Sequence, residues 1–126
     1  MAEDLFDRAL VLVMDGGQTL LANGGEVFRV QQTMEIMAAS LGVQDFHVYV
    51  LTNGIFASAH LPGGESVTLV RHVPTVSIHL GRVEAVNELS RELAAGKLGV
   101  VEAEQKLAAA RALPRVTPRR EVLACI

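Results

Sequence analysis

The sequence lacks tryptophan, contains one cysteine and has only 4% aromatic residues. Few side chains are therefore available to stack on bases, and a net charge of -3 opposes the phosphate neutralisation on which nucleic-acid binding depends. We expect no nucleic-acid partner. Because the lone Cys125 cannot form an internal disulfide, the sequence also indicates a reducing compartment.

Long hydrophobic runs are absent as well. The longest uninterrupted one covers residues 9–14, whereas a helix needs about 20 apolar residues to span a bilayer. The acidic start, Glu3 and Asp4, is unlike a signal peptide. Half of the 126 residues are hydrophobic, which excludes an intrinsically disordered chain and favours a single folded domain.

The first part of the chain has the periodicity of two helices. Apolar residues recur at three- and four-residue spacing over residues 3–23, and a second such pattern follows Gly24-Gly25 and ends before Gly42. These helices should form an antiparallel hairpin. Gly16-Gly17 in the first of them indicates either a close approach of two helices or a kink, because an internal glycine costs about 1 kcal/mol relative to alanine.

Alternating patterns then predict strands over residues 46–52, 55–61 and 66–72. A two-residue turn at Asn53-Gly54 would place His47 opposite His60, and it would pair Val48 with Ala59 and Val50 with Ala57. One face of the hairpin should be core, and it comprises Phe46, Val48, Val50, Ile55, Ala57, Ala59 and Leu61.

The remaining elements complete an α+β fold. Residues 73–78 contain Pro74 and should form an edge strand or an extended connector. Two helices are expected over residues 80–95 and 100–113, the first ended by Gly96 and the second by Pro114. The order predicts two N-terminal helices, a small antiparallel sheet of three to four strands, and two C-terminal helices against one sheet face.

Catalytic motifs are scarce. Facing His47 and His60 could share a metal, but no further ligand lies at a convincing spacing on these strands. There is no nucleophile-elbow motif, and Cys125 has no neighbour that would activate it. We therefore expect no catalytic residue, no metal and no cofactor, and the chain should not be an enzyme.

The best local candidate for binding is the junction formed by Gly24, Gly25, Glu26 and Arg29. Two glycines allow close backbone approach, the following helix offers free N–H groups, and Arg29 could pair with a carboxylate. In the simpler interpretation, which the sequence favours, the glycines make a turn, Glu26 complements the helix dipole and Arg29 forms an ion pair.

Positive charge gathers near the end of the sequence. Arg111, Arg115, Arg119 and Arg120 lie in a stretch without acidic residues, and an apolar run, residues 122–126, follows shortly after. This order is typical of a cytoplasmic segment that meets its first membrane helix. The alternative is a frayed basic tail. We expect a domain over residues 1–113 and a basic juxtamembrane segment over residues 114–126.

Several segments taken together resemble the amino-terminal cytosolic part of the threonine/serine exporter family. They are residues 20–30, Leu41-Gly42, residues 48–58, residues 80–91 and residues 96–107, and the similarity extends from about Ala9 to Leu113. Members often have a proline in the turn between the first two strands, where this chain has Thr52-Asn53-Gly54.

The resemblance implies the cytosolic domain of an inner-membrane exporter of small amino acids, with a role in gating, assembly or substrate sensing. In this family a bundle of transmembrane helices follows the domain, and some members divide the transporter between two polypeptides. The expected partners are the membrane region of the same transporter or a membrane subunit, a small amino acid, and further copies of the chain in a homo-oligomer.

The resemblance also implies proton coupling and a location at the cytoplasmic face of the inner membrane. We expect the chain to be a piece that stops where the membrane region begins; the alternative is a natural short protein. Because transporters hold substrate within their membrane helices, the domain alone should not bind threonine or serine. A hydrolase-like or metal-dependent domain using His47, His60, Glu26 or Arg29 remains the alternative, as does a structural oligomerisation module.

Overall fold

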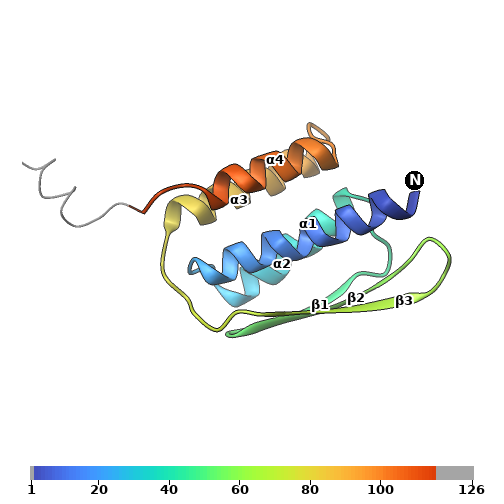
Figure 1. Cartoon of the computed structure of the whole chain (residues 1–126), viewed down its shortest axis with the longest axis horizontal. Helices are drawn as coiled ribbons and strands as arrows, with labels where there is room; N and C mark the ends of the chain where they lie inside the picture. The colour runs from blue at the N-terminus through green and yellow to red at the C-terminus, as the bar shows by residue number, and fades with distance from the viewer. Residues whose placement is uncertain (1, 116–126) are drawn as a thin grey trace, which may run out of the picture.

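The structure is a computed structural model, and it describes residues 2–115 (Figure 1). Four helices and three strands follow one another as α1 (Ala2–Ala22), α2 (Val27–Ser40), β1 (His47–Leu51), β2 (Gly54–His60), β3 (Ser66–His72), α3 (Leu80–Ala94) and α4 (Val100–Arg111). The α+β fold predicted from the sequence is confirmed, with helix boundaries within two or three residues of those expected. Arg119 and Arg120 of the predicted basic segment lie outside the described residues.

The elements form three layers. The antiparallel sheet, in the order β1-β2-β3, lies at the bottom of Figure 1, the α1–α2 hairpin covers it, and α3 and α4 lie above the hairpin. The middle layer therefore faces apolar neighbours on both sides. This explains why the consecutive residues Leu12, Val13 and Met14 of α1 are all buried although they point to different sides of the helix, whereas a surface helix would bury only one stripe.

The glycine pair in α1 marks a close approach of two helices and not a break, since α1 is one uninterrupted helix. A Cβ atom added at Gly17 would lie 2.2 Å from Sδ of Met34, and one added at Gly16 would lie 3.0 Å from Cε of Met37. Both methionines are fully buried. Because Gly16 and Gly17 have no side chains, α1 leaves room for Met34 and Met37 of α2.

The predicted faces of the sheet are correct, but the predicted register is wrong. Val48 lies opposite Ala57 and not Ala59, and Val50 lies opposite Ile55 and not Ala57. The true pairing is displaced by two residues. Because side chains alternate with a period of two, this displacement leaves the same residues on the buried face, and all five of these are buried.

The turn between β1 and β2 explains the displacement. It consists of Thr52 and Asn53, and Gly54 is the first residue of β2, paired with Leu51 on one side and with His72 on the other. Neither Asn53 nor Gly54 has the positive φ that a type I′ turn at these positions requires. Instead, the Asn53 carbonyl accepts a hydrogen bond at 2.9 Å from the backbone N–H of Val73, the residue that directly follows β3, so a segment distant in the sequence helps to set the turn.

Residues 73–79 form a connector that carries the chain from the sheet to α3 at the left of Figure 1. The alternative of an edge strand is not realised. The backbone N–H groups of Ser77 and His79 donate to the carbonyls of Ala22 and Asn23, at 3.0 and 2.9 Å, so the connector is attached to the end of α1. The N–H groups that an edge strand would have paired are thus satisfied by a helix end.

Candidate functional site

The four predicted binding residues line one hollow of about 290 Å³. It lies between the α1–α2 turn, the first turn of α2 and one side of α3. Its lining is formed by Leu20, Gly24, Gly25, Glu26, Arg29, Val30, Val83, Glu84 and Asn87. The structure thus brings Gly24, Gly25, Glu26 and Arg29 together, and it adds residues from α3 that the local sequence pattern could not indicate.

The two glycines of this hollow meet different requirements. Gly24 has a φ of +98°, a conformation that side chains with a Cβ rarely adopt. Gly25 has no such strain, but a Cβ there would lie 2.8 Å from the carbonyl oxygen of Leu20, which accepts the Gly25 N–H at 2.7 Å. Both positions therefore need glycine to close the turn, whether or not a ligand binds.

Glu26 is the N-cap of α2. Its backbone is extended, with φ -74° and ψ 134°, and its Oε1 accepts a hydrogen bond from the N–H of Phe28 at 3.1 Å. The carboxylate therefore satisfies one of the free donors at the helix start. This is the simpler role that the sequence favoured for Glu26.

The side chain of Arg29, in contrast, has no hydrogen bond or ion pair among the side chains that the structure describes, residues 4–115. The ion pair that the sequence suggested for it is thus not formed within this part of the chain. Glu84 and Asn87 lie on the α3 wall of the same hollow, and Glu84 bonds Arg91 at 3.0 Å. The hollow therefore offers a guanidinium and carboxylates, which are the groups that recognise the two charges of a zwitterion.

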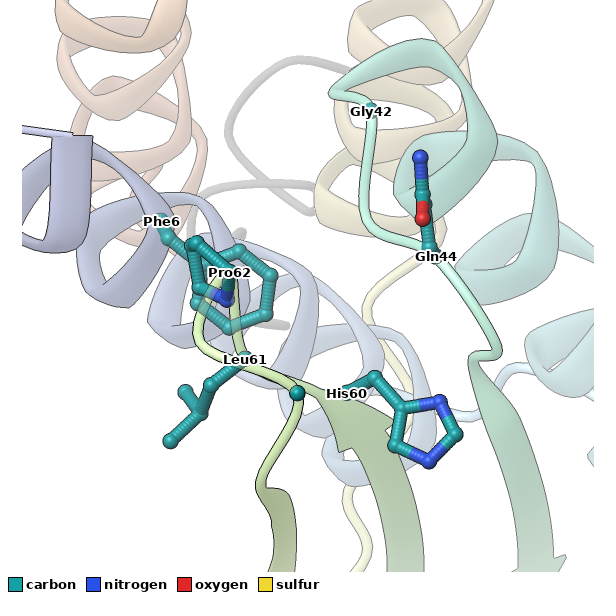
Figure 2. A pocket seen from close by; sticks show the side chains of 7 residues that line it. Phe6, Gly42, Gln44, His60, Leu61 and Pro62 are labelled. Carbon is teal, nitrogen blue, oxygen red and sulfur yellow. The ribbon is translucent and has the colours of Figure 1, made fainter.

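A larger hollow, of about 490 Å³, lies at the opposite end of the molecule (Figure 2). Phe6 of α1 and Pro62 of the β2–β3 turn form one part of it, and His60 lies at the end of β2. His60 is the only titratable side chain in its lining, and its Nδ1 lies 2.5 Å from Oδ2 of Asp45. This hollow lacks the opposed charges found at the α2 start.

Sequence comparison identifies the family. The profile of the threonine/serine exporter family, ThrE, matches residues 11–126. The chain belongs to this family. No curated protein and no solved structure matches the chain. The match covers all of the described domain except the first turns of α1, and membership of a transporter family favours a non-enzymatic role and an association with membranes.

Within residues 2–115 of this exporter-family chain, no helix has the length and hydrophobicity needed to cross a bilayer. The described part also contains no group of three His, Cys, Asp or Glu side chains that could hold a metal ion. The expected His47–His60 pair is wrong: His47 lies opposite Ser58, and His60 lies opposite Ser66. The displaced hairpin register makes the two histidines diagonal neighbours instead of directly opposite ones, and both line a shallow hollow beside Asp45.

Two further histidine contacts of the exporter-family chain were not predicted. His79 is the N-cap of α3, where its Nδ1 accepts from the N–H of Arg82 at 3.1 Å and its Nε2 lies 3.0 Å from the carbonyl of Pro114. The His60–Asp45 contact was also missed. For the His79 cap, the sequence offers a weak signal, because this histidine directly precedes a helical pattern. For the His60–Asp45 contact it offers none, since Asp45 has a positive φ of 50° that no sequence pattern predicts.

Proposed function

We propose that this chain is the cytosolic domain of an inner-membrane exporter of small amino acids of the threonine/serine type. Residues 1–113 are its folded unit, and residues 114–126 lead toward the membrane region of the same transporter or of a partner subunit. The domain acts at the cytoplasmic face in gating or assembly. Its working form is a homo-oligomer.

One observation carries this proposal: the exporter-family match runs from the middle of α1 through the rest of the helix–sheet–helix domain and into the basic segment, over residues 11–126. The contacts of the residues that follow α4 also support it. The last described residues, Leu113 to Arg115, are hydrogen-bonded to the start of α3 and the connector, so the chain leaves the domain from a fixed place.

Membrane topology tests the proposal. In cells that make the native protein, it should fractionate with membranes, and a cysteine introduced as Arg119→Cys in a Cys125→Ser background should react only with reagents added from the cytoplasmic side. A native protein found in the soluble fraction contradicts the proposal, as does labelling of position 119 from the outside.

The hollow at the start of α2 favours substrate sensing as a second candidate function. Arg29 would bind the carboxylate of threonine or serine beside the free N–H groups of α2, and Glu84 would bind the ammonium group. The specific observation in favour is that the guanidinium of Arg29 lines this hollow without a bond to any side chain described in residues 4–115.

Calorimetry distinguishes sensing from the other roles. If the domain senses substrate, threonine or serine should give saturable heat, and Arg29→Ala should weaken binding by about 1.5 kcal/mol or more. Arg8→Ala is the matched control, because that arginine lies near the far end of α1 and pairs with Glu104. Absence of heat with the unaltered chain excludes sensing at this hollow and leaves gating or assembly.

A further inference from the structure

The end of the molecule where α1 and α4 end and α3 begins carries an unusual surface, which we call the connector face. It consists of Val76, Ile78, Leu80, Arg82, Arg111 and Arg115. Hydrogen bonds hold its parts together: Nη1 of Arg115 donates to the carbonyl of Ile78 at 3.1 Å, and the Arg82 guanidinium donates to the carbonyl of Leu113 at 3.0 and 2.8 Å. These contacts join the connector, α3 and the last described residues into one surface.

The apolar side chains of the connector face are strongly exposed. Ile78 is 73% exposed, Leu80 72% and Val76 48%, although the N–H groups of the neighbouring Ser77 and His79 are bonded to the end of α1. The backbone is thus held in place while its aliphatic side chains face solvent. Such a cluster is costly in water and indicates a surface that is covered by something apolar.

The arginines of the connector face are held by neutral acceptors. Arg82 and Arg115 both donate to Oδ1 of Asn23, at 3.3 and 3.4 Å, and otherwise to backbone carbonyls. Among the described residues, the carboxylate paired with Arg111 is that of Asp15, at 3.9 Å, and Arg71 already binds it at 2.6 Å. Within residues 2–115, the three guanidinium groups of the connector face thus have one carboxylate beside them, that of Asp15, and it is already paired with Arg71.

Charge of the opposite sign lies at the other end of the molecule. The start of α1, the β2–β3 turn and the start of α4 all lie at the right of Figure 1, away from the connector face. They carry Asp4, Asp7, Glu65 and Glu102. With a net charge of -3, the chain as a whole is repelled by an anionic surface, so electrostatics favour an approach with the connector face first.

We propose that the connector face binds the surface of an anionic phospholipid bilayer, with Val76, Ile78 and Leu80 inserted among the headgroups and the arginines on the lipid phosphates. The pairing of exposed aliphatic side chains with uncompensated arginines fits a lipid surface, which offers both chemistries side by side. A symmetric contact with a second copy would bring like charges together. The inference rests on the proposed location beside a membrane region, and it assigns the surface that faces the bilayer.

Sedimentation with lipid vesicles tests the role of the apolar side chains of the connector face. The full chain should bind vesicles that contain phosphatidylglycerol more strongly than vesicles of phosphatidylcholine alone, and added salt should weaken the binding. Ile78→Ser with Leu80→Ser should lower the partition coefficient about tenfold. The matched control is Leu5→Ser with Val101→Ser at the acidic end, where the side chains are 52% and 47% exposed; it should bind as the unaltered chain does.

A second pair of variants tests the charge. Arg111→Gln should lower the partition coefficient about fivefold, the effect expected of one basic residue at an anionic surface. Lys97→Gln removes the same charge from the α3–α4 loop at the other end and should have little effect. Because residues 116–126 are identical in all these proteins, any contribution they make to lipid binding cancels in the comparison.

Three outcomes overturn the inference. The first is that the chain binds anionic and neutral vesicles equally well. The second is that connector-face variants and control variants bind vesicles equally well while their circular dichroism is unchanged. The third is that light scattering shows a dimer, and that Ile78→Ser with Leu80→Ser dissociates it. The last would make a second copy the occupant. The proposed function fails separately, through the topology experiment on the native protein: a membrane-bound native protein whose connector-face variants bind vesicles normally would refute only the lipid contact.

Discussion

Gly17 should be the residue of α1 least tolerant of substitution. A Cβ at this position would lie 2.2, 2.7 and 2.8 Å from Sδ, Cε and Cγ of Met34. Met34 is fully buried, so its side chain cannot move into solvent and the helices would have to separate or the methionine adopt a strained rotamer. Overpacking of this kind costs up to about 3 kcal/mol.

Helix propensity acts in the opposite direction, because alanine is favoured over glycine in a helix interior by about 1 kcal/mol. Gly17→Ala should therefore lower the free energy of unfolding by about 2 kcal/mol, and the melting temperature by about 8 °C. Gly16→Ala is the matched control. Its Cβ would lie 3.0 and 3.2 Å from the end of Met37 and in ordinary contact with Val86 at 3.9 Å, so a small shift of Met37 suffices and propensity offsets most of the cost.

Urea denaturation followed by circular dichroism measures the difference. In a cycle with Met34→Ala, the loss caused by Gly17→Ala should shrink by about 1 to 2 kcal/mol, because the atoms that clash have been removed. If Gly17→Ala proves as stable as Gly16→Ala, or if Met34→Ala leaves its effect unchanged, the close approach of α1 and α2 at this point is refuted.

Three more predictions concern ion pairs and caps. Asp15→Asn should cost about 1 kcal/mol in urea denaturation, since it weakens the half-buried pair with Arg71 that joins α1 to β3; an unchanged midpoint would exclude that role. Glu26→Ala should cost about 1 kcal/mol and Glu26→Ser almost nothing, because serine also caps a helix; equal losses would contradict the cap. The hydrogen bond from Arg8 lowers the pKa of Glu104, so its small stabilisation is complete above the usual glutamate range and is lost as pH falls through the lowered pKa. Acid titrations of the unaltered chain and Arg8→Gln should therefore diverge at neutral pH and converge in acid; parallel curves would exclude this linkage.

The sequence predicted the elements and faces of this fold well because both depend on local periodicity. Apolar spacing identified all four helices and the three strands, and glycines at Gly42 and Gly96 mark helix ends with φ values of 75° and 73°. The hairpin register failed because its turn is set partly by the bond from Val73 to the carbonyl of Asn53. That contact comes from the first residue after β3, 20 positions further along the chain, which no turn rule includes.

For the candidate site, too, the sequence predicted the local part and missed the part that depends on tertiary packing. The segment from Gly24 to Arg29 is continuous in the sequence, so a turn followed by a helix start could be recognised without a structure. Glu84 and Asn87 complete the hollow only because α3 packs beside α2. Three-residue spacing on a helix places them on one side of α3, but many other pairs in α3 and α4 share that spacing. The face of α3 that lines the hollow is set by the packing of α3 against α2, which the sequence pattern does not show.

The two glycine pairs shape the helical hairpin at two places, Gly16-Gly17 within α1 and Gly24-Gly25 in the turn that leads to α2. Gly17 lets Met34 pack against α1, and Gly25 lets the chain pass the carbonyl of Leu20 before it enters α2. Together they fix both the distance between the helices and the point at which α2 begins. The position of Arg29 relative to α3 follows from that starting point. A functional test at Arg29 is therefore interpretable only in variants that keep these glycines, because replacing either would move the hollow as well as any ligand in it.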